Sequence, residues 1–166
     1  MRYSDHPFPP YTYVPGKSPH PRSDASGHSF GEPEPHVSTF DVGKWRESPE
    51  YLFGVDLFNA AFYWESHEQW EALWHSVGRR GDVADFLKGL IKLAAANVKR
   101  LEGNDSGVQR HADRATQLFA KVCVSHEVLA GLELSRLVDI AKRHGDEHAT
   151  INSHRVTLRL KGISQI

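Results

Sequence analysis

Proline is confined to the start of this chain, and that distribution constrains the fold more than any other feature. All nine prolines lie at or before Pro49, and the remainder of the chain contains none. Proline lacks the backbone N–H that helices use, and it pushes the residue before it into an extended conformation. We therefore expect an extended N-terminal arm, rich in Pro and His, over 1–47, a helical domain over 48–145 and a tail over 146–166.

Composition narrows the classes of protein to which the chain can belong. Its 166 residues are enough for one packed core, and its formal net charge of -1 supplies no overall positive field for a nucleic acid. No run approaches the ~20 apolar residues of a membrane span. Cys123 is the sole cysteine, and the N-terminus lacks an apolar run of the signal-peptide type. We expect a cytoplasmic protein that binds neither nucleic acid nor membranes.

Beyond Pro49, apolar residues recur at the spacing of amphipathic helices. Ser48 is a suitable N-cap for the first helix, with Pro49 at its first helical position. Short connections make consecutive helices antiparallel neighbours, so the pattern predicts an all-α, up-and-down bundle of about five helices. The expected helices are one that includes Tyr51, Val55, Phe58 and Phe62, one over about 63–75, one from a capping arrangement at Asp82 and Asp85 to Gly103, one marked by apolar residues over 108–122, and a short one over 134–141 that ends before Gly145.

Two segments outside these helices carry apolar residues suited to covering the bundle. In the tail, Val156, Leu158 and Leu160 alternate with polar residues, which predicts a short extended segment. Aromatic anchors distinguish the arm from an ordinary disordered segment, so we expect it to lie against the helices. These anchors are Phe8, Tyr11, Tyr13, Phe30, Phe40 and Trp45.

The helix expected over 63–75 concentrates an imidazole and carboxylates on one face. His67 and Glu71 are four residues apart, and Glu68 lies beside them. A His and a Glu at this spacing can clamp one divalent cation, while a neighbouring Glu orients or deprotonates a bound water. We expect His67 and Glu71 to be metal ligands and Glu68 to be the general base or a third ligand of a metal-dependent hydrolase.

Histidines elsewhere in the chain bear on this site. His20 and His28 of the arm would complete the ligand set if the arm folds over the second helix. The alternative is that they are turn and surface residues. We expect His111, beside Arg110, to face solvent or to contact an anion rather than to bind a metal.

Two alternatives to the enzyme follow from the same residues. In the first, cations of the third or fourth helix pair with Glu65, Glu68 or Glu71, and the cluster is a structural polar network in a non-enzymatic helical binding module. In the second, the start of the fourth helix forms a pocket for a small anion or nucleotide. A small molecule or a protein is the expected partner, and a homodimer fits a small aromatic-rich bundle. The candidate binding residues are Trp64, Glu65, Trp74, Lys92, Arg110 and Arg114.

The string FNAAFYWESHEQWEALW at 58–74 resembles the hallmark of the bacterial domain-of-unknown-function family 309. The string LKGLIKLAAA at 87–96 is similar to the second block of that family, and residues 103–114 resemble its third. The resemblance implies an all-helical bundle, and some members of the family are labelled metal-dependent hydrolases on the basis of this motif. Ala61 stands where a glycine is usual, which argues against a sharp turn, and Lys92 stands where Gln is frequent, which brings a cation toward the metal site.

Overall fold

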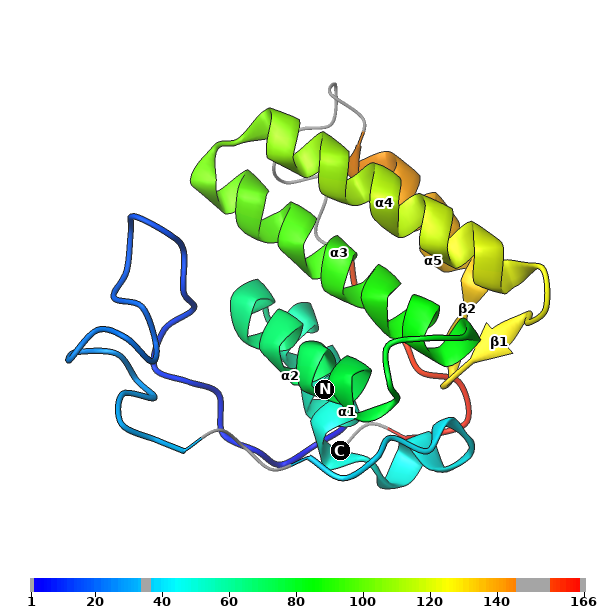
Figure 1. The fold of residues 1–166 in the computed structure, drawn as a ribbon, viewed down its shortest axis with the longest axis horizontal. Helices are drawn as coiled ribbons and strands as arrows, with labels where there is room; N and C mark the ends of the chain where they lie inside the picture. The colour runs from blue at the N-terminus through cyan, green and yellow to red at the C-terminus, as the bar shows by residue number, and fades with distance from the viewer. Residues whose placement is uncertain (1, 34–36, 146–155, 165–166) are drawn as a thin grey trace.

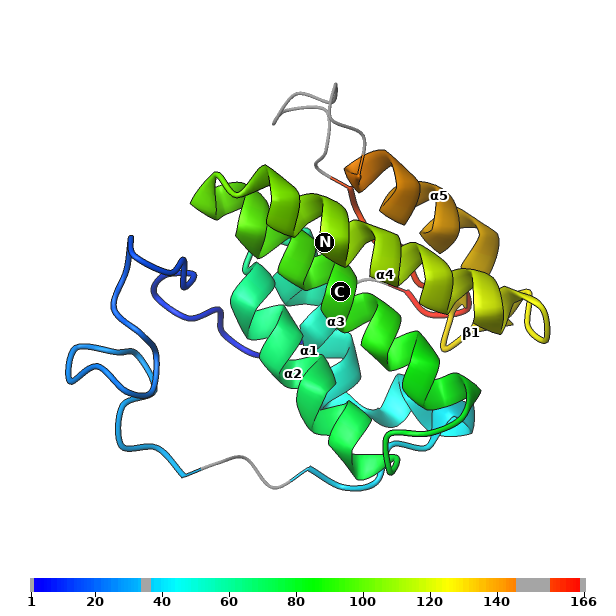
Figure 2. The same cartoon turned by 45° about the horizontal axis from the view of Figure 1, so that its top comes forward.

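The computed structural model describes residues 2–33, 37–145 and 156–164. Within them, five α-helices follow one another, and each packs chiefly against the next, so that α3 and α4 lie side by side with α2 and α5 on either side (Figures 1 and 2). This architecture confirms the predicted all-α, up-and-down bundle. The elements are η1 (Val42–Glu47), α1 (Pro49–Asn59), α2 (Tyr63–Ser76), α3 (Asp82–Glu102), α4 (Asp105–Cys123), β1 (Val128–Leu129), β2 (Leu132–Glu133) and α5 (Leu134–His144).

The helix ends follow local sequence signals with one exception. The Ser48 side chain accepts a hydrogen bond from the backbone N–H of Tyr51, as an N-cap does, and Gly103 ends α3 in the left-handed conformation at φ 79°. The capping arrangement expected at Asp82 and Asp85 is wrong, because Gly81 is the N-cap of α3 and makes no side-chain cap. The two carboxylates instead contact cationic or imidazole groups of later residues, Asp82 with His126 and Asp85 with Lys121.

A sharp turn joins α1 to α2 even though no glycine occupies it. Ala61 adopts φ 69°, in the left-handed region that glycine normally fills. The backbone N–H of Phe62 donates to the carbonyl oxygen of Leu57, which closes the turn. The expectation that Ala61 prevents a sharp turn is therefore wrong, because Ala61 adopts the strained left-handed conformation.

Close packing around two glycines brings helix pairs together. A Cβ atom built on Gly54 of α1 would lie 2.5 Å from Nε1 of Trp70 on α2, and one built on Gly89 of α3 would lie 2.4 Å from a ring atom of Phe119 on α4. Both rings are fully buried. Because a side chain at either glycine would separate the helices, these positions fix the spacing of the layers that carry the candidate site.

The arm lies against the bundle and is not wholly extended. Its last residues form the helix η1, which corrects the expectation of a non-helical segment up to residue 47, and Trp45 of that helix is buried. Asp41 caps η1 by accepting from the backbone N–H of Gly43. The helix η1 therefore begins after the prolines of the arm that precede it and directly after its capping residue, Asp41.

Residues 156–164 of the tail lie against the bundle. Leu158 and Leu160 are buried and Val156 is half-buried, so the expected extended segment covers the core at these positions. The rest of the expected tail, 146–155 and 165–166, lies outside the described residues. A two-residue hairpin, β1 and β2, was not anticipated; its turn places Ala130 and Gly131 at φ 45° and 78°. No helix in the described ranges is long and apolar enough to cross a membrane.

Candidate metal centre

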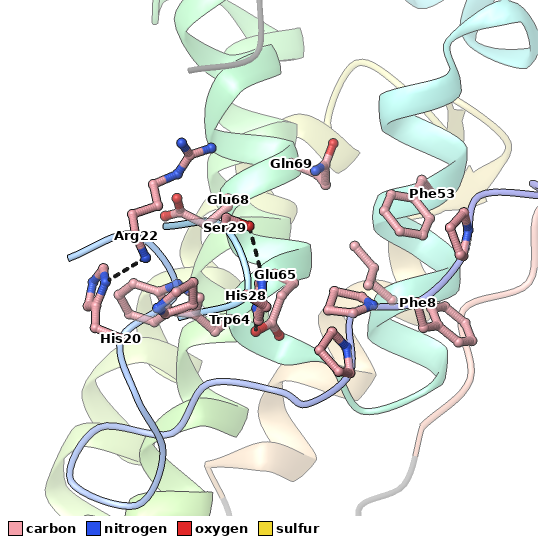
Figure 3. A pocket seen from close by; sticks show the side chains of 15 residues that line it. Phe8, His20, Arg22, His28, Ser29, Phe53, Trp64, Glu65, Glu68 and Gln69 are labelled. Atoms are coloured by element: carbon pink, nitrogen blue, oxygen red, sulfur yellow. Dashed lines mark hydrogen bonds and ion pairs between the residues drawn. The ribbon is translucent and has the colours of Figure 1, made fainter. Parts of the chain in front are cut away.

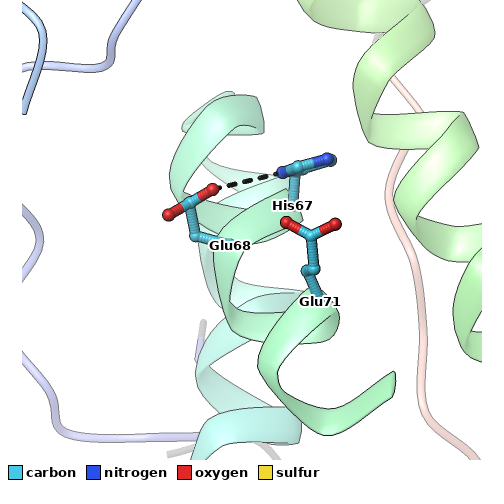
Figure 4. A group of neighbouring side chains, drawn as sticks. All are labelled: His67, Glu68 and Glu71. Atoms are coloured by element: carbon cyan, nitrogen blue, oxygen red, sulfur yellow. Dashed lines mark ion pairs between the residues drawn. The ribbon is translucent and has the colours of Figure 1, made fainter. Parts of the chain in front are cut away.

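Three side chains of α2 converge on one point of its surface. His67, Glu68 and Glu71 each offer a ligand atom, and these atoms all lie within 4.8 Å of one another (Figure 4). The convergence follows from helical geometry, since residues four apart stack on one face and the residue between them lies alongside. All three side chains are half-buried. This group is able to hold a metal ion.

His67 is positioned by an indole and faces a carboxylate. Its ring stacks on that of Trp64 at a centroid distance of 5.7 Å, and its Nδ1 lies 3.6 Å from Oε1 of Glu68. This Nδ1 is shielded from solvent and has no hydrogen-bond partner among the described residues. The interaction with His67 lowers the pKa of Glu68 against the opposing effect of burial. Glu68 is therefore ionised at neutral pH, as a ligand or a base must be.

The chemistry of the donor set fits a divalent transition metal. One imidazole nitrogen and two carboxylate oxygens form a ligand set of the kind found at open metal sites with room for water. Ligand atoms around an ion at ~2.1 Å lie about 3.4 Å apart, so binding would require small rotamer changes of these side chains. Buried polar atoms normally have a hydrogen-bond partner, and Nδ1 of His67 has none among the described residues. This is an independent indication that a ligand binds at this point.

The arm histidines do not join this group. Nδ1 of His20 accepts the backbone N–H groups of Arg22 and Ser23, and its ring packs edge-on against Trp64. Nε2 of His28 lies 3.4 Å from Oε1 of Glu65, and its Nδ1 lies 2.9 Å from Oγ of Ser29. The structure thus places His20 and His28 close to α2, where local contacts occupy both nitrogens of His28 and Nδ1 of His20.

Glu65 fastens the arm to α2. Its carboxylate is buried and accepts hydrogen bonds from Oγ1 of Thr12 and from the backbone N–H of Tyr13, both at 2.8 Å. Tyr13 also packs edge-on against Trp64 at a centroid distance of 4.8 Å. Two residues of the sequence-derived binding set, Trp64 and Glu65, therefore hold the arm in place and face it.

The arm and the first two helices enclose a pocket of about 330 Å³ (Figure 3). One wall comes from the prolines and Phe8 of the arm, and the opposite wall comes from α1 and α2. Glu68 lines this pocket and also belongs to the His67 group, so the pocket borders the candidate metal centre. The polar side chains around it are His20, Arg22, His28, Ser29, Glu65, Glu68 and Gln69.

The cations expected as structural partners of the carboxylates do not pair with them. Lys88 places its ammonium over the ring of Trp74, 3.8 Å from the centroid. Within the described part of the chain, Lys92, Arg110 and Arg114 have no carboxylate oxygen within 4.0 Å. Lys92 nevertheless lies near Glu71, which acts to raise its pKa, while burial, Lys88 and Arg114 lower that pKa more strongly. Lys92 is thus a basic side chain beside the candidate site that forms no ion pair with it.

His111 of α4, which we expected to face solvent or to contact an anion, lies near the candidate site. It is half-buried, and burial together with the charges of Lys92 and Arg110 lowers its pKa to about 4. His67 also acts on it, which brings α2 and α4 within electrostatic reach of each other. Its position was readable, because His111 lies three residues after Val108 and four before Ala115 on the apolar stripe of α4.

Comparison with known proteins concerns the part of the chain that carries this site. No curated protein matches the chain. Residues 51–111 match the model of a protein family described as a domain of unknown function, DUF309. The matched residues comprise nearly all of α1, the whole of α2 and α3, and α4 as far as His111. This stretch of the chain is therefore similar to the DUF309 family, and His67, Glu68 and Glu71 lie inside it.

Proposed function

We propose that this chain is a metal-dependent hydrolase whose centre is the His67, Glu68 and Glu71 group. The observation that carries the proposal is the convergence of three ligand atoms within 4.8 Å on one helix. A divalent ion bound there would supply a water whose pKa is lowered to about 7. His67 and the carboxylate of Glu71 would hold the ion. Glu68 takes up the proton of the attacking water or serves as the third ligand.

The arm-covered pocket is the proposed substrate cavity. Glu68 is the residue shared by the pocket and the metal group, so a bond placed beside it is within reach of both. The walls formed by Phe8, Phe53 and Trp64 exclude water and select a substrate with an apolar portion. Glu65 does not take part in the reaction, because its oxygens are occupied by Thr12 and Tyr13.

The structural polar network is the weaker account of the same residues. It requires Glu71 or Glu68 to be paired with a cation of α3 or α4, and no such pair lies within 4.0 Å in the ranges that the structure describes. Glu71 therefore remains available to a ligand. This observation favours the metal centre over the binding module.

Metal content tests the proposal directly. Protein purified without an affinity tag is analysed by inductively coupled plasma mass spectrometry, before and after reconstitution with zinc, manganese or ferrous iron. We expect close to one metal ion per chain in the wild type and its loss in His67→Ala and Glu71→Ala. The matched control is His75→Ala, an exposed histidine of α2 outside the group, which should keep the metal. A wild type that takes up no metal under any of these conditions contradicts the proposal.

Glu68→Gln separates the two roles of Glu68. If it is the general base, the variant keeps the metal and loses hydrolysis in a screen of ester and amide substrates. If it is a ligand, metal retention falls as well. Circular dichroism spectra confirm that each variant is folded before either result is interpreted.

A further inference from the structure

A second hollow, of about 800 Å³, lies on α4 where that helix borders Lys92 of α3. It is separate from the arm-covered pocket, with which it shares no lining residue. Arg110 and Arg114 line it from successive turns of α4, and His111 lies between them in sequence. The hollow thus gathers three basic side chains from two helices in a chain whose formal net charge is -1.

These cations lack the partners that would normally offset their mutual repulsion. Neither Arg110 nor Lys92 forms an ion pair or a hydrogen bond through its side chain in the described ranges, and Arg114 donates only to Oε1 of Gln117, at 3.1 Å. Like charges four residues apart on a helix disfavour it, and burial of the Lys92 ammonium adds to the cost. Burial, Lys88 and Arg114 together lower the pKa of Lys92. A bound anion would reduce the repulsion between these side chains and would stabilise the buried ammonium of Lys92.

The carboxylates around the hollow do not provide that relief. Asp105 and Asp113 also line it, but the side chain of Asp113 accepts a hydrogen bond from Nε2 of Gln109 on its own helix at 2.9 Å. Asp105 lies in the first turn of α4, where the helix dipole stabilises it. Neither acid forms an ion pair with Arg110 or Arg114 within the described ranges.

We propose that this hollow binds an oxyanion of the phosphate type. Arg110 and Arg114 present planar guanidinium donors that match tetrahedral oxyanions, and Lys92 adds a point charge from α3. The imidazole of His111 lies in the same lining and offers a further N–H group. The fold fixes the positions of these basic residues, because they come from two helices whose spacing is set by the contact of Gly89 with Phe119.

The neighbourhood of Lys92 and Glu71 connects this hollow to the metal group. The ligand we assign is a small organic phosphate, which binds outside the arm-covered substrate cavity.

Titration of metal-free protein tests the anion site independently of the metal. Backbone amide resonances of chelator-treated protein are followed by NMR during addition of inorganic phosphate or phenyl phosphate at constant ionic strength. We expect saturable shifts around residues 105–117 and an affinity about tenfold weaker in Arg110→Gln and in Arg114→Gln, the loss of one charge-assisted contact. Arg136→Gln, which removes an exposed arginine of α5, should bind like the wild type.

The outcomes separate this inference from the proposed function. Absence of saturable shifts in the wild type, or equal weakening by Arg136→Gln, overturns the oxyanion site. Phenyl phosphate that binds more tightly than inorganic phosphate supports an organic phosphate as ligand, whereas equal or weaker binding overturns that assignment. Phosphate binding by a protein that retains no metal leaves the site standing and removes the hydrolase; metal retention without phosphate binding does the reverse.

Discussion

The side chain of Asn59 forms two hydrogen bonds with the backbone of Leu158, ninety-nine residues away in the sequence. Its Nδ2 donates to the carbonyl oxygen at 2.9 Å, and its Oδ1 accepts the N–H at 2.7 Å. Asn59 is the last residue of α1, so its amide meets the tail at the end of the helix that precedes the candidate site. The Asn59 side chain thus satisfies both the N–H and the carbonyl oxygen of Leu158, which lies outside any β-strand.

Asn59→Ala should lower the free energy of unfolding by about 1 to 3 kcal/mol, because it orphans a donor and an acceptor in a half-buried position. Chemical denaturation measures the loss, and hydrogen exchange should show reduced protection of the Leu158 amide. Asn59→Asp is the comparison variant, since it keeps the acceptor for that N–H but replaces the donor with a charged oxygen that faces the Leu158 carbonyl. A fully protected Leu158 amide in Asn59→Ala would contradict this role.

Ala61→Gly should stabilise the protein by about 0.5 to 1 kcal/mol. Relief of the left-handed backbone strain, about 1 to 2 kcal/mol for a residue with a Cβ atom, exceeds the entropy cost of an added glycine, about 0.5 to 1 kcal/mol. Thermal and urea denaturation measure the gain. Ala60→Gly is the control, because Ala60 has φ -91° and a glycine there adds only the entropy cost. Destabilisation by Ala61→Gly would show that the turn gains nothing from glycine.

Gly89→Ala should destabilise the protein by about 1 to 3 kcal/mol despite the higher helix propensity of alanine. The new methyl group would lie 2.4 Å from the Phe119 ring, which is fully buried and has no free space into which to move. Phe119→Leu should offset part of the loss in the double variant, which a double-mutant cycle measures. Additive effects of the two substitutions would contradict a direct contact.

The stability of the protein should fall in mildly acidic solution in part because of His111. Its pKa is about 4 in the folded protein and 6.5 ordinarily, so the unfolded chain binds this proton more readily. The contribution is therefore complete above pH 6.5 and is lost as the pH falls toward 4. His111→Gln should show a smaller decrease in melting temperature between pH 7 and pH 5 than the wild type.

NMR titration of His111 provides the direct check on that cause. Its ring protons should titrate with a midpoint near pH 4 in the wild type. Lys92→Gln removes one of the cations that lower this pKa and should move the midpoint upward. A midpoint near 6.5 in the wild type would remove the physical basis of the stability prediction.

Helices and their caps were predictable because they depend on nearby residues. Ser48 with Pro49 marked the start of α1, and Gly103 marked the end of α3, as the structure has them. The grouping of His67 with Glu71 was also predictable, since a helix brings residues four apart together. These relationships span only one turn and need no knowledge of the tertiary fold.

Relationships between distant segments were not readable in this way. The local pattern around Glu65 gives no sign that Thr12 and Tyr13 bind its carboxylate, because the partners lie more than fifty residues away. The half-buried position of His111 was not predicted, because its neighbour Arg110 favoured solvent or an anion contact, although His111 borders the apolar stripe of α4. The left-handed Ala61 was excluded by propensity, whereas packing of α1 on α2 imposes it.

The arm binds the helices as a covalently attached peptide ligand would. Asp56 of α1 is buried and accepts from the backbone N–H groups of Tyr3 and Ser4, and Glu65 of α2 accepts from Thr12 and Tyr13. Helices separated from this segment would lose the donors that the arm supplies to both carboxylates. A peptide of the arm sequence supplied in trans would meet those receptors, with an affinity reduced only by the effective concentration that the covalent link now provides.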